Sequence, residues 1–495
     1  MFFARAKTWA WRLVTGPGEE GSGGNVLPVL LGVGLFLRLF PPLGRDGLGP
    51  MEIYQIVLGR RIGEGRAWWD DLVFAHHGPV TPVVLRLWTS IGPFFASDGG
   101  VRLVSVLISM VLIAGVYVWL RRSAGEWAGR FAAAFLCVND LVVDFSRDAR
   151  LYSLHALLVT GAAWLVWRAL VRPGAATFVG AAAATCAAIL NHLVAAPFAA
   201  GLAVGAVLST GFTRARRLFA AASVLAGIAL SSPWAILLLS QARADADLRP
   251  NDLGWWLELV GLVSGGHLLW MAFLPVLLVA RWRTILAPCV PFDPCAAAAG
   301  RIASSSAVSG VFLVGAFGIL VMPASRTEWL LPAFPLFAIW LGVAAGRMAE
   351  AGRAIAAITA VAVPFVAAIV TVAGGGAHDS GVREKGAARA ACLAARAAGV
   401  AGPVVVVPSF KQFSVAYYWP EATFVSADLY VEKGVGEPAS RGGASSEIVV
   451  MYWRNLCALP SARGECSRAR DRAAAHARRR FIYADDDVEV WALAP

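Results

Sequence analysis

The sequence has 495 residues, of which 58% are hydrophobic and only 15% are charged. Soluble domains carry about a quarter charged residues, and one soluble core could not bury this much apolar surface. The net charge of +11 comes from Arg residues clustered between apolar runs. This pattern is typical of membrane-protein loops and argues against a nucleic-acid-binding face. The composition therefore predicts an integral membrane protein.

Apolar runs along the first three quarters of the chain predict a bundle of membrane-spanning helices. A helix needs about 20 apolar residues to cross the hydrocarbon, and we expect about eleven crossings. The expected spans are 25–43, 101–120, 131–145, 151–170, 174–191, 193–210, 218–240, 257–280, 304–323, 329–346 and 354–373. The run 80–97 is shorter and contains Pro82 and Pro93, so we expect a juxtamembrane helix there.

Loop charges orient these spans, because Lys and Arg gather on the cytoplasmic side. Arg5, Lys7 and Arg12 precede the first span and predict a cytoplasmic N-terminus. Five later Arg clusters also lie on the cytoplasmic side only if the run 80–97 does not cross the membrane. They contain Arg121, Arg122 and Arg130; Arg168 and Arg172; Arg214, Arg216 and Arg217; Arg281 and Arg283; and Arg347 and Arg353. The first loop, the turn 146–150 and the C-terminal region then lie outside.

The composition changes after Gly374-Gly375-Gly376, which divides the chain into a membrane domain, 1–373, and a soluble domain, 374–495. Periodicity predicts a small α/β layer in the soluble domain. Its helices are expected at 380–399 and 467–479, and its strands at 404–407, 448–452, 480–484 and 488–493. Cys457 and Cys466 pair if this domain faces an oxidising compartment and stay free if it does not.

Acidic residues in the first outer loop are candidates for catalysis. Glu52 precedes a helical stretch, where it either favours the helix dipole as a first-turn acid or acts as a general base. Tyr54 and Asp46 lie close to it in the sequence. The residues alone leave both roles of Glu52 open.

The turn 146–150 places Asp148 between Arg147 and Arg150. These charges either cap the adjoining helices or hold a phosphate and a divalent cation. His192 is either a satisfied loop residue or a ligand, and Arg326 is either a snorkelling side chain or a contact to a lipid phosphate. No Walker loop or dinucleotide-binding motif is present in the sequence, so no nucleotide cofactor is expected.

Four segments, taken in order, resemble glycosyltransferase family 39. They are His77–Leu85 (HGPVTPVVL), Val101–Ser105 (VRLVS), Ser146–Tyr152 (SRDARLY) and Arg326–Pro332 (RTEWLLP). They are similar to the family's "HPPLYYLLL", "LRLPS", "SQEARMY" and "RYLLP". The family consists of GT-C membrane transferases, including protein O-mannosyltransferases and lipid A aminoarabinose transferases. The likeness covers most of 30–350 and is strongest at 77–152.

This resemblance implies a polytopic helical membrane enzyme that moves a sugar from a polyprenyl phosphate to an extracytoplasmic lipid, glycan or protein, with inversion. It places the enzyme in the bacterial inner membrane. It matches Glu52 to the Glu of the family's first-loop Asp-Glu pair, and Asp148 to the second-loop acid that helps to hold a divalent metal or the phosphate. Arg150 and Arg326 would face the donor phosphate, and His77 would line the pocket. The remaining implied substrate contacts are Tyr54, Arg147, Tyr152 and His192.

One position departs from the family pattern. Family members place the catalytic Asp immediately before the Glu that Glu52 matches, and here that position is Met51. Either Glu52 acts as the base, or Asp46 reaches in, or catalysis is lost. The rival interpretations are therefore a catalytically degenerate member and a transporter or flippase of lipid-linked sugars.

Overall fold

The computed structural model describes residues 26–40, 42–43, 48–64, 78–242, 293–320, 331–350, 387–400, 402–407, 412–425, 448–454, 457, 460–475, 479–484 and 488–493. The chain divides into two compact units. The helical unit contains 1–42, 67–88 and 101–377, and the mixed unit contains 43–66, 89–100 and 378–495. Each unit has its own hydrophobic core. The boundary predicted near residue 374 lies outside the described residues.

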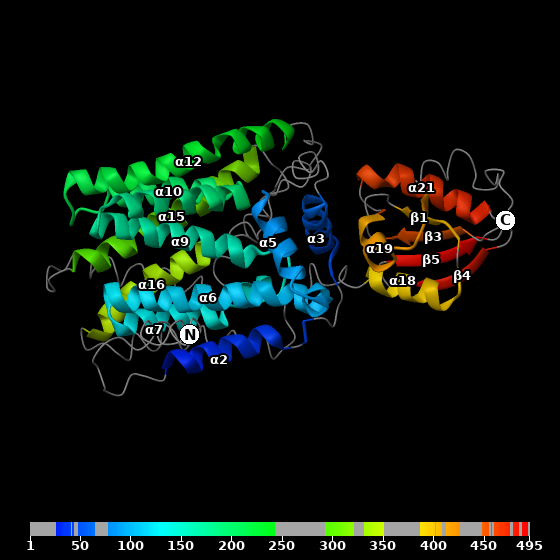
Figure 1. Ribbon diagram of the computed structural model, residues 1–495, viewed down its shortest axis with the longest axis horizontal. Coiled ribbons are helices and arrows are strands. Elements are labelled where there is room, and N and C mark those ends of the chain that lie inside the picture. The colour runs from blue at the N-terminus through cyan, green and yellow to red at the C-terminus, as the bar shows by residue number, and fades with distance from the viewer. Residues whose placement is uncertain are drawn as a thin grey trace. The chain divides into compact units, whose positions relative to one another are not determined.

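The helical unit is a bundle in which the consecutive helices between residues 98 and 242 are joined by short turns (Figure 1). Its helices are α2 (Val26–Leu39), α5 (Val80–Thr89), α6 (Asp98–Ala124), α7 (Glu126–Val138), α8 (Asp140–Phe145), α9 (Tyr152–Val171), α10 (Ala175–Asn191), α11 (Ala195–Val207), α12 (Arg214–Ala242), α15 (Pro294–Leu320) and α16 (Ala333–Glu350). Helix α10 packs against both α9 and α12, α11 packs against α15, and α16 packs against α7. The predicted helical membrane bundle is confirmed.

Three helices of the described ranges have the length and apolar composition to cross a membrane: Asp98–Ala124, Tyr152–Val171 and Arg214–Leu237. Shorter apolar helices accompany them, including α2, α10 and α11. The expected spans 257–280 and 354–373 lie outside the described residues, so the number of crossings remains a prediction.

Two of the expected elements differ in detail from the structure. The run 80–97 forms the ten-residue helix α5 followed by the 3-10 turn Pro93–Ala96. Ten residues make a helix about 15 Å long, half of the roughly 30 Å hydrocarbon thickness. The expected span 131–145 is divided between α7 and α8 at Asn139, whose side chain accepts the Val142 N–H at 3.0 Å and caps α8.

Close helix contacts in the bundle depend on small residues. Gly342 and Gly346 lie one turn apart on α16, against Ala128 of α7. A Cβ added at Gly342 would lie 2.6 Å from the Ala128 carbonyl oxygen, and one added at Gly346 would lie 2.9 Å from its nitrogen. Apolar side chains gain little by leaving lipid for another helix, so this close backbone approach supplies much of the packing attraction.

Arg38 of α2 is fully buried, although it lies in an apolar run. Its guanidinium donates to Ser109 Oγ on α6 and to the carbonyl oxygens of Gly34, Leu136 and Cys137, at 2.9 to 3.0 Å. Two of these carbonyls end α7 and have no partner within an α-helix. Arg38 therefore fastens α2, α6 and the end of α7 together through satisfied hydrogen bonds.

The mixed unit is built around a five-stranded sheet of order β2-β1-β3-β5-β4. Its strands are β1 (Val404–Val407), β2 (Phe424–Val425), β3 (Ile448–Trp453), β4 (Arg479–Ala484) and β5 (Val488–Leu493), and its helices are α3 (Pro50–Gly63), α18 (Ala387–Ala397), α19 (Gln412–Tyr418) and α21 (Pro460–Ala475). β1 is parallel to β2 and β3, whereas β5 is antiparallel to β3 and β4. The predicted α/β layer is confirmed, with α19 and β2 as additional elements.

Alternating side chains of the strands build a core on each face of this sheet. On one face Val404 and Val406 pack with Ala391 of α18. On the other face Val405 and Val407 pack with the residues around α21. Both faces of β1 are therefore covered, which explains its uninterrupted run of Val.

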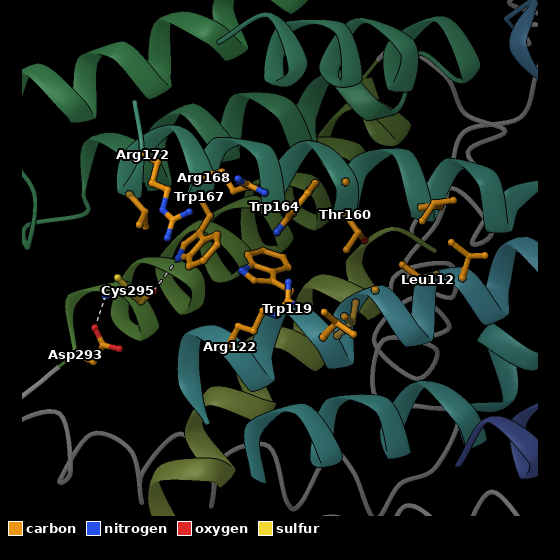
Figure 2. A pocket seen from close by; sticks show the side chains of 17 residues that line it. Leu112, Trp119, Arg122, Thr160, Trp164, Trp167, Arg168, Arg172, Asp293 and Cys295 are labelled. Carbon is orange, nitrogen blue, oxygen red and sulfur yellow. Dashed lines mark hydrogen bonds between the residues drawn. The ribbon is translucent and has the colours of Figure 1, made fainter. Parts of the chain in front are cut away.

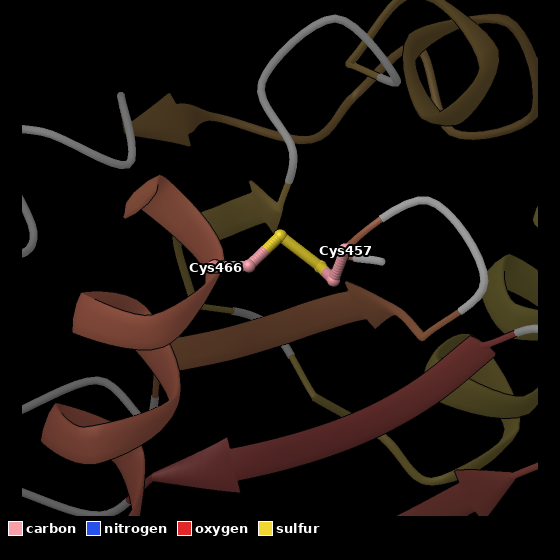
Figure 3. The surroundings of a disulfide bond; sticks show 2 residues. All are labelled: Cys457 and Cys466. Carbon is pink, nitrogen blue, oxygen red and sulfur yellow. A yellow bond between two sulfur atoms is a disulfide. The ribbon is translucent and has the colours of Figure 1, made fainter. Parts of the chain in front are cut away.

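Cys457 and Cys466 form a disulfide between the segment after β3 and helix α21 (Figure 3). Their Cα atoms are 5.5 Å apart, within the usual range for a disulfide. Of the two alternatives left open by the sequence, the structure shows the paired one.

Candidate functional site

The turn between α8 and α9 contains a buried ion pair. The Arg150 Nε donates to Asp148 Oδ2 at 2.7 Å, and the Arg150 backbone N–H donates to Asp148 Oδ1 at 2.9 Å. The Asp148 side chain is 3% exposed and that of Arg150 is 17% exposed. Both carboxylate oxygens thus hold Arg150 in one orientation, as expected for a charge-assisted pair.

The Tyr152 ring lies beside this pair, and the rings of His192 and His155 follow it in that order. The Arg150 guanidinium carbon lies 5.2 Å from the Tyr152 ring centroid. The Tyr152 ring lies 6.4 Å from that of His192, and His192 lies 5.2 Å from His155, measured between centroids. Tyr152, His155 and His192 are all buried. The structure therefore brings Asp148 together with three other predicted site residues, Arg150, Tyr152 and His192, and adds His155.

Leu151 joins the ion pair to helix α9 in the left-handed conformation, with φ 53° and ψ 37°. This conformation is uncommon for a residue with a branched side chain and costs of order 1 kcal/mol. It lets the chain turn sharply between Arg150 and Tyr152. Stored backbone strain of this kind is concentrated at functional sites.

The start of the first family-like segment is docked onto the end of α10. The Gly78 N–H donates to the Asn191 carbonyl oxygen at 3.2 Å, and Thr81 Oγ1 donates to Asn191 Oδ1 at 2.9 Å. A Cβ at Gly78 would lie 1.2 Å from the Leu190 carbonyl oxygen, so only glycine fits there. This contact places Gly78, which follows His77 in the sequence, beside Asn191, which precedes His192.

The second and third family-like segments also meet. Ser105 Oγ on α6 and Ser153 Oγ on α9 are 3.3 Å apart, and both residues are buried. Arg102, one turn before Ser105, is 4% exposed. Segments that begin near residues 78, 101 and 146 therefore assemble within the helical unit around the end of α10.

Arg147 lies in the same turn and donates to the carbonyl oxygen of Phe40, after the end of α2. This contact supports the capping alternative for Arg147. Its role in substrate binding remains a prediction.

In the mixed unit, Glu52 lies in the first turn of α3 and is 1% exposed. Its Oε2 accepts the Gly49 N–H at 2.6 Å. The first-turn role considered for Glu52 is thus observed, and its role as a base remains a prediction. Tyr54 is half-buried on the same helix.

A polar network inside the mixed unit links the chain at Leu48, just before α3, with the first residue of α6 and the C-terminal helices α18 and α19. Tyr418 Oη accepts the Leu48 N–H at 2.6 Å and donates to Asp98 Oδ2 at 3.4 Å. Arg389 Nη1 lies 3.3 Å from the same Asp98 oxygen. Asp98, Tyr418 and Arg389 therefore tie α18 and α19 to residues about three hundred positions earlier.

Tyr417 extends this network toward α3. The Arg60 guanidinium carbon lies 5.4 Å from the Tyr417 ring centroid, and Tyr417 Oη donates to the Ala96 carbonyl oxygen at 3.3 Å. Burial, aided by the charge of Asp98, raises the pKa of Tyr417 to about 12. Burial also raises the pKa of Tyr418. Both phenols therefore remain protonated at neutral pH and act as hydrogen-bond donors.

A divalent metal does not fit the residues that the structure describes. No group of three or more His, Cys, Asp or Glu side chains gathers there as a metal site. Asp148, the predicted ligand, has both oxygens engaged by Arg150. The chemistry proposed below therefore uses no metal-dependent step.

Asp46, His77 and Arg326 lie outside the described residues, so their roles also remain predictions. The sequence did not indicate His155, Asp98 or Tyr418, nor that Asn191 would accept hydrogen bonds from Gly78 and Thr81. The adjacency of Asn191 to His192 was a usable signal for Asn191. The contact between Asp98 and Tyr418 spans 320 positions, and nothing in either local sequence indicates it.

Comparison with known proteins defines the class of this fold. The chain has the fold of GT-C membrane glycosyltransferases. Residues 76–237 match the family described as dolichyl-phosphate-mannose-protein mannosyltransferase. The match includes Gly78, Asp148, Arg150, Tyr152 and His192. The family resemblance stated from the sequence is thereby confirmed.

Among solved structures, the chain is similar to ArnT from Cupriavidus metallidurans. Against ArnT bound to undecaprenyl phosphate, the TM-score is 0.59 at 16% identity, with 98% of each chain covered. Against ArnT in the apo state, the TM-score is 0.59 at 16% identity, with 99% of this chain and 98% of ArnT covered. At this identity the similarity defines the fold. No curated protein matches the chain.

Proposed function

We propose that this protein is an inverting glycosyltransferase of the bacterial inner membrane. It takes a sugar from a polyprenyl phosphate and passes it to an extracytoplasmic lipid, cell-wall glycan or protein. The observation that carries the proposal is the assembly of family-like segments around the buried pair of Asp148 and Arg150, beside Tyr152 and His192. ArnT, which has the same fold, is known with undecaprenyl phosphate bound.

The proposed reaction is a single displacement at the anomeric carbon of the donor. An acceptor hydroxyl oxygen forms a bond to this carbon from one face, and the bond to the phosphate oxygen breaks on the other face. The acceptor proton passes to a carboxylate base, and polyprenyl phosphate departs with the electron pair of the broken bond. The anomeric configuration is inverted, and all atoms and charges are accounted for.

Arg150 is the proposed partner of the departing phosphate. A guanidinium carries five N–H donors in a planar fork, a geometry that suits phosphate oxygens. Asp148 positions this fork before substrate arrives, because it accepts one hydrogen bond from the Arg150 Nε and a second from the Arg150 backbone N–H. Donors fixed in advance cost no reorganisation when negative charge develops on the leaving group. Asp148 thus acts as a positioning residue for Arg150.

Glu52 is the proposed base. Its carboxylate has one oxygen bonded to the Gly49 N–H, which fixes the side chain. The role requires that Glu52 and Asp148 act on the same donor from outside the membrane. Asp46 is the alternative base.

The disulfide supports an extracytoplasmic location for the C-terminal domain. Disulfides persist in the periplasm and outside the cell and are rare in the reducing cytosol. The pairing of Cys457 with Cys466 therefore agrees with the orientation expected from the Arg clusters.

Met51 favours one competing function, a family member that binds lipid-linked sugar without transferring it. The test is reconstitution of the full-length protein with radiolabelled polyprenyl-phosphate sugars and cell-envelope acceptors. Transfer of label to an acceptor supports the proposal. Label that crosses the bilayer on its lipid indicates a flippase, and label that only binds indicates a degenerate member.

The same assay distinguishes the two candidate bases. Glu52→Gln removes the proton acceptor, and we expect it to abolish transfer while the protein stays folded. Asp46→Asn is the matched variant and should retain transfer. The reverse result would assign the base to Asp46, and full activity in both variants would exclude both residues.

A further inference from the structure

The helical unit contains a second candidate site, at the other end of α6 and α9 from Asp148. A cavity of about 570 Å³ lies along these two helices and reaches the first residues of α15. Figure 2 shows its two parts: Arg122, Arg168 and Arg172 toward one end, and Thr160 and Leu112 toward the other. From Tyr152 to Arg168 the helix rises about 24 Å, so the charged end of this cavity lies far from the site described above.

The charged end of the cavity is built to hold an anion. Arg122, Arg168 and Arg172 contribute three cations against the carboxylate of Asp293. Within the described part of the chain, no carboxylate pairs with any of these three Arg side chains. Arg clusters at membrane helix ends are common, so the charges alone would not define a site.

Two buried polar atoms give independent evidence for a ligand. The Nε1 of Trp119 and the Oγ1 of Thr160 have no hydrogen-bond partner in the described structure, and both residues line the cavity. Their residues are 4% and 5% exposed. The neighbouring Trp167, in contrast, donates its Nε1–H to the Cys295 carbonyl at 3.0 Å. Buried polar groups left without a partner are costly, so the two atoms point to a polar occupant.

The rest of the cavity is apolar and elongated. Its lining includes Leu112, Val116, Leu157 and Gly161. From Thr160 to Arg172 the helix rises about 18 Å, long enough for a headgroup and part of an acyl chain. One charged end and one apolar groove match the two parts of a phospholipid.

We propose that this cavity binds an anionic membrane phospholipid, with its phosphate among the three Arg side chains and an acyl chain along the groove. The net positive lining favours a lipid of net negative charge over a zwitterionic one. The loop charges predict that this end faces the cytoplasmic leaflet. The proposal does not depend on the transferase activity.

Native mass spectrometry of the full-length protein in mild detergent tests the proposal directly. Phosphatidylglycerol should bind about tenfold more tightly than phosphatidylcholine. In the double variant Arg122→Gln/Arg168→Gln this preference should disappear, because two charge-assisted contacts are lost. The matched control is Arg214→Gln/Arg216→Gln, which removes two exposed cations of α12 outside the cavity and should preserve the preference.

A second variant tests the groove without changing any charge. Added atoms at Gly161 meet nothing within 4 Å, so Gly161→Leu places its side chain in the open cavity. It should weaken phosphatidylglycerol binding severalfold. Gly32→Leu, at an exposed and equally open helical position on α2, is the control and should have no effect.

Three results would overturn the proposal. The first is equal binding of the two lipids by the wild type. The second is the same loss of preference in the Arg control as in the cavity variant. The third is saturable binding of inorganic phosphate as tight as that of phosphatidylglycerol, which would indicate an anion site with no lipid groove. Equal melting temperatures of the variants would show that each is folded.

Discussion

The two ends of helix α9 place Arg beside an aromatic ring in different ways. At the first end Arg150 lies 5.2 Å from the Tyr152 ring centroid, and at the last end Arg168 lies 5.2 Å from that of Trp164. Arg150 is held by the buried carboxylate of Asp148 at 2.7 Å. Arg168 has no such carboxylate among the described residues and faces an open cavity.

An Arg beside an aromatic ring therefore suits two different tasks, depending on whether a buried carboxylate holds the Arg. A cation fixed by a buried acid has one orientation, which suits a group that must meet a phosphate at a defined point of a reaction. Cations without a paired acid in a wide cavity keep their net charge, which suits retention of a negatively charged headgroup. The first end should therefore respond to small changes in geometry, and the second end mainly to changes in charge.

The largest expected effect comes from breaking the ion pair between Asp148 and Arg150. Asp148→Asn keeps the side-chain size but removes the charge that orients Arg150, so transfer should fall about a thousandfold, as for the loss of one preorganised stabilising group. The rate of label transfer from the polyprenyl-phosphate sugar measures this. Asp471→Asn, at an exposed position of α21, should leave the rate unchanged. Normal transfer by Asp148→Asn would exclude the proposed role.

A smaller effect is expected when the charge is kept and only the geometry changes. Arg150→Lys retains a cation but loses the planar fork that Asp148 orients, so kcat should fall about tenfold to a hundredfold. Steady-state kinetics with varied donor would separate kcat from KM. An unchanged kcat with a raised KM would mean that Arg150 only binds the donor.

A third variant weakens the packing of the helical bundle and leaves Asp148 and Arg150 unchanged. Arg38→Met leaves the carbonyls of Leu136 and Cys137 without their buried donor, and we expect a loss of roughly 3 kcal/mol in stability. Thermal unfolding in detergent would show this as a lowered Tm. Arg301→Met is the comparison, because Arg301 also donates to a helix-end carbonyl, Leu208, but at an exposed site. Its loss should cost less than about 1 kcal/mol. An equal shift in Tm for both variants would contradict this account of burial.

The smallest expected effect is that of salt concentration, which should weaken lipid binding in the cavity more than it changes the transfer reaction. Raising salt from about 0.05 to 0.5 M shortens the screening length severalfold, so phosphatidylglycerol binding in the cavity should weaken about threefold. The kcat of transfer should change less, because the pair of Asp148 and Arg150 is largely shielded from solvent. Lipid binding that is independent of salt would argue against a charge-driven headgroup site.

The sequence predicted features that depend on local pattern. The Val run 404–407 indicated a strand buried on both faces, and the structure contains that strand as β1. The ordered family-like segments indicated a site near Asp148, and three of its predicted members lie together. Each signal works because spacing along the chain fixes which side chains share a face or a turn.

Features that depend on distant residues were not predictable in the same way. Arg38 looked like a residue near the end of an apolar span, and only the fold brings its four acceptors to it. Asn139 interrupts an apolar run, yet nothing local shows that it caps a new helix. The cavity required Trp119 and Trp167 to meet across 48 positions, with ring centroids 6.0 Å apart.

The transferase account requires that the first loop and the turn 146–150 face the same side of the membrane. The direct measurement labels single cysteines with a membrane-impermeant maleimide in right-side-out and inverted vesicles. The five cysteines other than Cys457 and Cys466 are first replaced, and the disulfide is kept. They are Cys137, Cys186, Cys289, Cys295 and Cys392.

Cysteine would be introduced at Glu64 after α3, at Arg147 in the turn and, as a cytoplasmic reference, at Arg216 of α12. The account predicts that positions 64 and 147 react only from the outer face and that position 216 reacts only from the inner face. Labelling of 64 and 147 from opposite faces would contradict it, because Glu52 and Asp148 could not then act on one donor.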